Sequence, residues 1–173
     1  MYRNDNDKKY ALLALIFVMI IFTLVSCGKE MRALRGDAHE LAWQIYERAG
    51  IDARGMEEKE LTELECYMLG IDEENFGKKV EEAKIFRPDS LSAGQSLCIV
   101  VAKSDYFAEE IFGEMQKNFE WVPCDPAENA VFMQYGKYVI LGKDSAEGAR
   151  AFSEAFAAET DGRAKTMFSQ NPM

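Results

Sequence analysis

Histidine is almost absent from this chain, and cysteines are few and widely spaced. Both absences limit the metal-binding and redox sites that the protein could form. His39 is the only histidine. His39 and Glu40 begin like the helix of a zinc peptidase, but Trp43 stands where the second metal-binding histidine would lie. No two cysteines have the Cys-x-x-Cys spacing of a thioredoxin-type site. We therefore predict neither a two-histidine metal site nor a redox site, and we expect His39 to be an exposed residue at the start of a helix.

Patterns that hold phosphate or calcium are also missing. The chain contains neither G-x-x-x-x-G-K-[ST] nor G-x-G-x-x-G. The acidic stretch 72–75 does not follow the residue order of a calcium-binding loop, so we interpret it as a turn and the start of a short helix. The sequence thus gives no indication of a cofactor or a bound metal.

Glutamate is abundant after residue 56. The run consists of Glu57, Glu58, Glu60, Glu63 and Glu65. Catalysis by paired carboxylates needs one carboxyl whose pKa is raised in an apolar cleft. A run this dense, with Lys59 placed to pair with Glu63, is more typical of a solvated helix face. We therefore expect an acidic helix over 57–64 with Leu61 and Leu64 inward; an envelope hydrolase or transferase that uses these carboxylates is the alternative function.

A long apolar run covers residues 11–25 and ends at Leu24-Val25-Ser26-Cys27, which resembles the lipobox of bacterial lipoproteins. The run is shorter than the roughly 20 residues that span a bilayer and suits a signal core. It predicts a signal peptide over 1–26, cleavage between Ser26 and Cys27, and a diacylglyceryl group, with fatty acids such as palmitate, on the Cys27 sulfur. An uncleaved signal anchor, with the run counted from residue 10 to 27, is the alternative.

These features predict a protein anchored to the cell membrane through Cys27 and facing the extracytoplasmic side. The short tether 27–36 carries Lys29, Arg32 and Arg35, which favour contact with an anionic lipid surface. The formal net charge of the whole chain is −10, and the residues after the tether hold the acidic excess. An acidic domain is repelled by lipid head groups and by nucleic acid, so we expect no nucleic-acid partner.

Residues 37–159 are predicted to form a single domain, long enough for one sizeable core, and 160–173 a flexible tail. The domain opens with a helix. Its apolar residues recur at steps of three and four, Asp37 is a plausible N-cap and Gly50 ends the helix. The residues of this apolar stripe are Ala38, Leu41, Ala42, Ile45 and Ala49.

Two strands and a helix follow. Residues 82–87 are predicted as a strand that ends at Pro88, and 97–102 as a central strand that is buried on both faces. Ser104 or Asp105 then caps a helix whose core stripe is Phe107, Ile111, Met115 and Phe119. This stripe packs either on Leu97, Ile99 and Val101 or on the opposite side of the strand, with Cys98 and Val100.

Strands 130–135 and 138–141 flank Gly136-Lys137, a pair that suits a tight hairpin turn. Tyr135 and Tyr138 beside it are expected to form a cross-strand pair, with stacking on a sugar or peptide as the alternative. Asp144, three residues before Glu147, is predicted to cap the last helix. The order β-β-α-β-β-α favours an α+β two-layer sandwich, with an antiparallel sheet of about four strands, helices on one face and an N-terminal helical segment.

Three cysteines remain after Cys27, and an extracytoplasmic location permits disulfides. Cys98 lies within the most apolar strand and Cys66 among apolar neighbours, so both are expected in the core. Cys124, in Pro-Cys-Asp-Pro, is expected to be exposed and free. A Cys66–Cys124 disulfide is the alternative.

Four stretches together resemble one family, an uncharacterised group of short lipoproteins from Gram-positive anaerobes with a domain of unknown function. They are HELAWQIYERAG, EEAKIFRP, SLCIVVAK with SDYFAEEIFGEM, and NAVFMQYGKYVILGKDSAEGARAFSEAF, within 40–156. The resemblance implies an extracytoplasmic α+β domain and no particular activity. The sequence as a whole predicts a non-enzymatic binding or accessory module, whose ligand is an envelope protein or a small molecule.

Overall fold

The computed structural model describes residue 34 and residues 36–89 and 94–172. The predicted signal, with Ser26 and Cys27, lies outside the described residues, as does most of the predicted tether. None of the helices in the described part of the chain has the length and apolarity that crossing a bilayer requires.

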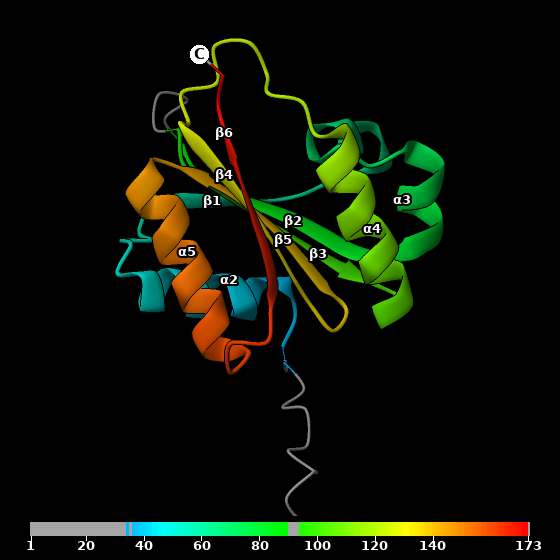
Figure 1. Ribbon diagram of the computed structural model, residues 1–173, viewed down its shortest axis with the longest axis horizontal. Helices are drawn as coiled ribbons and strands as arrows, with labels where there is room; N and C mark the ends of the chain where they lie inside the picture. The colour runs from blue at the N-terminus through cyan, green and yellow to red at the C-terminus, as the bar shows by residue number, and fades with distance from the viewer. Residues whose placement is uncertain (1–33, 35, 90–93, 173) are drawn as a thin grey trace, which may run out of the picture. The chain divides into compact units, whose positions relative to one another are not determined.

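The centre of the structure is a six-stranded antiparallel sheet in the order β1-β2-β3-β5-β4-β6 (Figure 1). In chain order its strands are β1 (Met56–Glu60), β2 (Val80–Pro88), β3 (Ser96–Ala102), β4 (Asn129–Tyr135), β5 (Tyr138–Asp144) and β6 (Lys165–Gln170). The strands predicted from sequence are therefore present, and β1 and β6 extend the sheet at its two edges. The α+β class and the antiparallel sheet are confirmed, whereas the prediction of about four strands is wrong.

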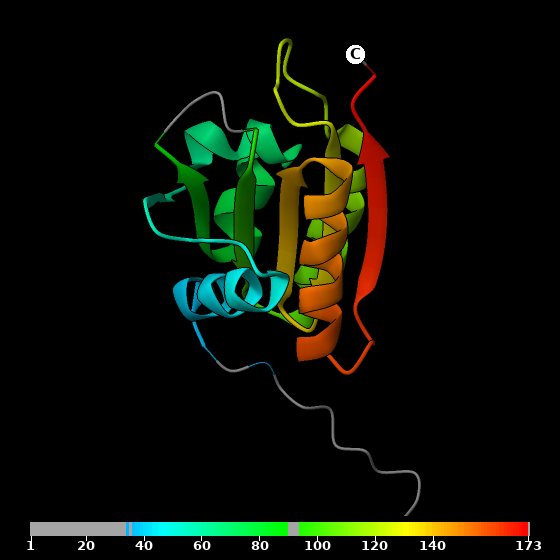
Figure 2. The same cartoon turned by 90° about the vertical axis from the view of Figure 1, so that its left-hand side faces the viewer.

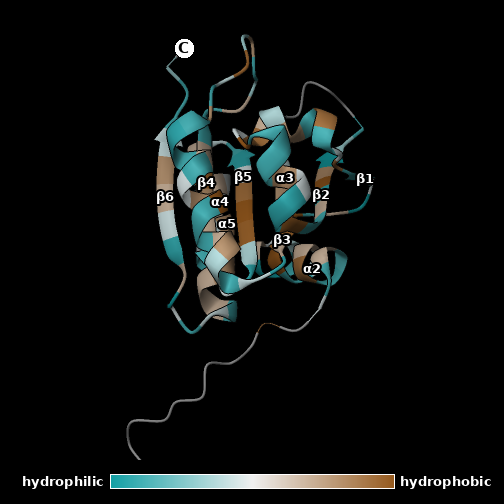
Figure 3. Ribbon diagram, turned by 90° about the vertical axis from the view of Figure 1, so that its right-hand side faces the viewer, coloured by the Kyte–Doolittle hydropathy of each residue, from teal (hydrophilic) through white to brown (hydrophobic). Residues whose placement is uncertain are grey.

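Helices cover both faces of this sheet, so the structure has three layers. Helices α2 (Ala38–Ala49) and α5 (Ala146–Glu159) lie on one face (Figure 2). Helices α3 (Glu73–Lys79) and α4 (Asp105–Asn118) and the 3-10 helix η1 (Glu63–Leu69) lie on the other (Figure 3). The prediction of two layers with helices on one face is thus wrong. The reason lies in the central strand: every residue of β3 is buried, and a strand that is apolar on both faces needs cover on both.

Helix α2 has the predicted boundaries and caps. Asp37 Oδ1 accepts a hydrogen bond of 2.9 Å from the backbone N–H of Glu40, and Gly50 ends the helix at φ 69°. Leu41 and Ile45 are buried against the sheet. Local signals and apolar spacing agree here, which explains why the sequence predicts this helix well.

Helix α4 packs on the face of β3 that carries Cys98 and Val100, which is one of the two alternatives that the sequence left open. Ile111 and Met115 are fully buried in the core that contains Cys98 and Val100. Phe107 and Phe119, at the ends of the predicted stripe, are partly buried against the same core. Ser104 is the N-cap, because its hydroxyl accepts a hydrogen bond of 3.2 Å from the N–H of Phe107.

Strand β1 takes up residues 57–60 of the predicted acidic helix over 57–64, and residues 63–64 begin η1. The strand pairs with β2 in the register Glu58↔Phe86 at one edge of the sheet. Lys59 contacts Glu65 and not Glu63, because residues 57–60 are extended and the helical spacing does not apply. A run of consecutive charged residues on an exposed edge strand resembles a polar helix in sequence, and pairing with β2 decides between them.

Strand β6 lies within the predicted flexible tail. It pairs with β4 in the register Val131↔Phe168, and Met167 packs against the core under α4. The prediction of a tail over 160–173 is wrong for these residues. As an edge strand, β6 is largely solvent-exposed and carries few apolar side chains, so its sequence resembles a tail.

The β4–β5 hairpin forms as predicted, with Gly136 at φ 54° and Tyr135 opposite Tyr138. The Tyr138 hydroxyl donates a hydrogen bond of 2.7 Å to the backbone oxygen of Gly36, which fixes the chain just before α2. The cap of α5 differs from the prediction: Ser145 accepts from the N–H of Gly148 at 3.1 Å, while Asp144 is the last residue of β5.

Candidate functional site

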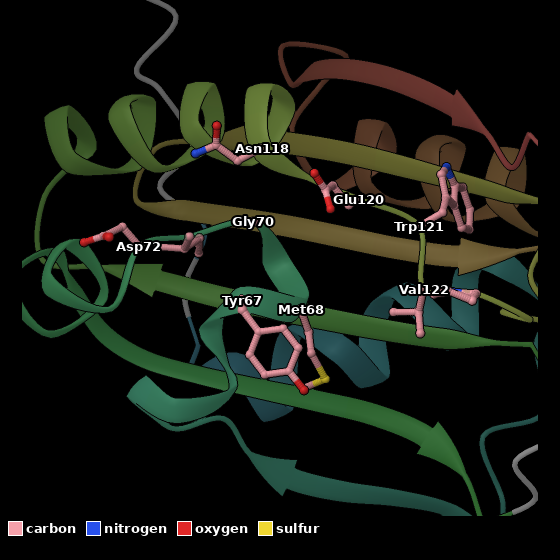
Figure 4. Close-up of a pocket in the computed structure, with 10 residues that line it drawn as sticks. Tyr67, Met68, Gly70, Asp72, Asn118, Glu120, Trp121 and Val122 are labelled. Atoms are coloured by element: carbon pink, nitrogen blue, oxygen red, sulfur yellow. The ribbon is translucent and has the colours of Figure 1, made fainter.

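The candidate site is an open groove between η1 and the chain that leaves the C-terminal end of α4 (Figure 4). Its volume is about 490 Å³. Its larger lining side chains are Tyr67, Met68, Ile71, Trp121, Val122 and Pro123, and its polar ones are Asp72, Asn118 and Glu120. Tyr67 and Met68 lie side by side on η1, across the opening from Val122 (Figure 4).

Gly70 allows the two walls of the groove to meet. It ends η1 at φ 72°, a left-handed conformation in which side chains other than glycine are strained. A Cβ atom at this position would lie 2.6 Å from the backbone nitrogen of Phe119 at the end of α4. Only glycine therefore lets the turn after η1 lie directly against the α4 terminus.

The apolar wall on the α4 side is held in place by aromatic packing. Phe119 contacts Trp121 edge-to-face at a centroid distance of 5.4 Å and Phe132 of β4 at 5.1 Å. The Trp121 indole Nε1 donates to the Ser169 hydroxyl of β6 at 3.3 Å. These contacts fix the orientation of Trp121, so one side of the groove is preformed.

The η1 side presents apolar groups to solvent. Tyr67 is 70% exposed and Leu64, three residues earlier, is 77% exposed. Side chains three residues apart lie on one face of a 3-10 helix. An apolar strip therefore continues from the groove along η1. The prediction that Leu64 points inward is wrong, whereas Leu61 is buried as predicted.

The charged side chains that line the groove, Asp72 and Glu120, are both carboxylates. Asp72 also caps α3, because its Oδ1 accepts a hydrogen bond of 2.9 Å from the N–H of Glu74. Glu114 lies close by and accepts from the backbone N–H of Asp72 at 2.6 Å. The groove is thus apolar in its walls and negative in charge.

His39, the only histidine, lies outside this groove, at the contact between α2 and β1. Its Nδ1 contacts Glu58, and its Nε2 accepts a hydrogen bond of 2.8 Å from the Trp43 indole. Both ring nitrogens are therefore engaged with side chains of the domain. The arrangement joins α2 to the edge of the sheet and presents no free nitrogen as a base.

Two carboxylates of the glutamate run, those of Glu58 and Glu65, are each paired with a lysine. Hydrogen bonds from Lys84 and, to a smaller extent, from His39 lower the pKa of Glu58 below its ordinary value. Lys59 in the same way lowers the pKa of Glu65. A general acid needs the opposite shift. Glu57 and Glu60 are exposed on β1.

The three cysteines of the described part of the chain are free. Burial raises the pKa of Cys98 to about 12 and also raises that of Cys66, so both thiols stay protonated at neutral pH. Cys124 is exposed as predicted. The alternative of a Cys66–Cys124 disulfide is wrong. No group of three or more potential metal ligands occurs within 36–89 and 94–172.

Comparison with known proteins adds no relative: no protein-family model, curated protein or solved structure matches the chain. The resemblance to a lipoprotein family therefore stays a prediction. The interpretation of the site rests on its geometry.

The sequence analysis did not single out Trp121 or Tyr67 and missed the groove that they line. Its walls come from η1 and from the segment after α4, which are far apart in sequence. One signal was present: Leu64 lies between Glu63 and Glu65, and Tyr67 follows three residues later.

Proposed function

We propose that this protein is a lipid-anchored extracytoplasmic binding module, whose ligand occupies the groove between η1 and the end of α4. The protein would be held at the cell membrane by Cys27 and would act by binding an envelope component. Catalysis would have no part in its role.

The anchor is supported by the sequence alone. Ser26 and Cys27 close an apolar run of signal length, and the tether that follows is basic. Two acyl chains on such a cysteine suffice for lasting membrane attachment, whereas one does not.

The binding role is carried by one observation: the groove presents exposed apolar side chains beside a preformed aromatic wall. Tyr67 is 70% exposed and Val122 54%, while Phe119 and Ser169 hold Trp121 in place. Large apolar groups gathered at a surface hollow are typical of a contact site for another molecule.

The environment of the reactive groups favours binding over catalysis. His39 is engaged at both nitrogens, the pKa of Glu58 is lowered, and the thiols of Cys66 and Cys98 are buried with raised pKa values. The pKa shifts of Glu58, Cys66 and Cys98 are opposite to those that a general acid or a thiol nucleophile needs near neutral pH. Each of these residues has a structural role in the sheet or its helices.

We expect no turnover when the full chain is incubated with muropeptides, esters, phosphoesters or peptides. Muropeptides are the most demanding substrates, because two carboxylates alone can hydrolyse a glycosidic bond. Product release would be followed by mass spectrometry, with Glu58→Gln and Glu60→Gln variants assayed in parallel. Turnover that is lost in either variant would contradict the binding-module proposal and favour a carboxylate hydrolase.

A further inference from the structure

We infer that the groove binds a short peptide segment in which apolar side chains alternate with lysine or arginine. This inference rests on the proposed binding function and names the class of its ligand. It follows from three properties of the groove: its charge, its aromatic walls and its continuation along η1.

Charge complementarity selects a cationic ligand. Asp72 and Glu120 are the charged residues that line the groove, and Glu114 adds a third carboxylate behind Asp72. A cation that enters would meet carboxylates and no competing ammonium or guanidinium group among the lining residues. An anionic ligand would be repelled.

The walls select side chains that combine apolar surface with positive charge. Met68 and Val122 offer aliphatic contact, and Tyr67 and Trp121 add two aromatic residues to the lining. A lysine or arginine packs its methylene stem on such a surface and is attracted to the face of an aromatic ring. The same groove therefore accommodates apolar and basic side chains in neighbouring positions.

The apolar strip that continues from the groove along η1 favours a peptide ligand over a small molecule. Leu64 is 77% exposed, lies one turn of the 3-10 helix from Tyr67 and is not part of the groove lining. A compact cation that fills the groove would leave Leu64 in water. An extended peptide could cover the groove and Leu64 together, with successive side chains on each.

The test uses the lipidated full chain in nanodiscs of zwitterionic lipid, with empty nanodiscs as background. The probe is a short fluorescein-labelled peptide of alternating lysine and phenylalanine. Two matched probes replace lysine with glutamate or phenylalanine with serine. Binding is measured by fluorescence anisotropy at low and high salt. We expect the first probe alone to bind and its affinity to fall with added salt.

Two substitutions and two controls locate the site. We expect Tyr67→Ala to weaken binding roughly tenfold, as for an aromatic residue that carries much of a contact. Glu120→Gln should weaken it by up to about fivefold. Tyr106→Ala changes a tyrosine of similar exposure (66%) at the opposite end of α4, and Glu147→Gln a carboxylate on α5, across the sheet. Neither should change the affinity.

The outcomes separate this inference from the proposed function. Equal losses for Glu120→Gln and Glu147→Gln, with no effect of Tyr67→Ala, would mean attraction to an acidic surface only and would overturn the inference. Tighter binding of the glutamate probe would also overturn it. Neither result would overturn the binding-module proposal, which turnover of muropeptides would contradict.

Discussion

Replacing Cys27 with alanine should leave the protein as a longer precursor without lipid. Lipidation takes place on the cysteine sulfur, and cleavage before residue 27 depends on the modified cysteine in the signal that this sequence resembles. Expression in a Gram-positive host with a labelled fatty acid would show the effect directly. The unchanged chain should carry label and run at mature size, whereas Cys27→Ala should lose all label and run as the precursor.

The matched control is Cys124→Ala, which removes a different exposed thiol and should keep both label and mature size. Loss of label in the control would point to a general defect in expression. A Cys27→Ala protein that still runs at mature size with labelled lipid would contradict the lipoprotein assignment. An unchanged chain that is bound to membranes at precursor size, without label, would instead favour the uncleaved signal anchor.

Truncating Ile111 to alanine should lower the free energy of unfolding by about 2–5 kcal/mol. Ile111 is fully buried where α4 packs on the sheet, among Cys98, Val100 and Leu141. Removing its side chain loses apolar contact and leaves a cavity that a sheet and a helix cannot readily close. Denaturant titration followed by tryptophan fluorescence would measure the loss.

Gln116→Ala provides the control on the same helix. Gln116 is exposed, so its replacement should change the free energy of unfolding by no more than about 0.5 kcal/mol. A loss below about 0.5 kcal/mol for Ile111→Ala would contradict the packing of α4 in this register.

Helices and strands could be predicted from the sequence where the capping or turn residues and the spacing of apolar residues indicate the same element. Helix α2 has a capping aspartate, a terminal glycine and a clear apolar stripe, and strand β3 is apolar throughout. The two edge strands lacked such signals. β1 is almost wholly charged and β6 alternates weakly, so their state is set by the neighbouring strands β2 and β4.

The layer count shows how a correct local prediction can still give a wrong arrangement. The sequence predicted that β3 is buried on both faces, which already requires helices on both sides of the sheet. The face of the sheet that each helix covers depends on the path of the chain between helix and strand, and the spacing of apolar residues does not determine that path. In the structure α2 and α5 pair on one face and α4 takes the other.

The groove could not be predicted from local sequence patterns either, because its walls come from segments that are far apart in the chain. Tyr67 and Trp121 line one groove because Gly70 lets the end of η1 meet the end of α4. No local pattern encodes that meeting. His39 and Glu58, which the sequence analysis considered as possible reactive groups, link α2, β1 and β2 through contacts with each other and with Lys84.

The most direct test of the account is site-specific photo-crosslinking of the lipidated chain in intact cells. A photoreactive phenylalanine analogue would replace Tyr67 in the groove or, as the control, Tyr106 at the other end of α4. The account predicts light-dependent adducts in the membrane fraction from position 67, absent from position 106, and reduced by Glu120→Gln. Equal adducts from both positions, or none from position 67, would contradict a binding site in the groove.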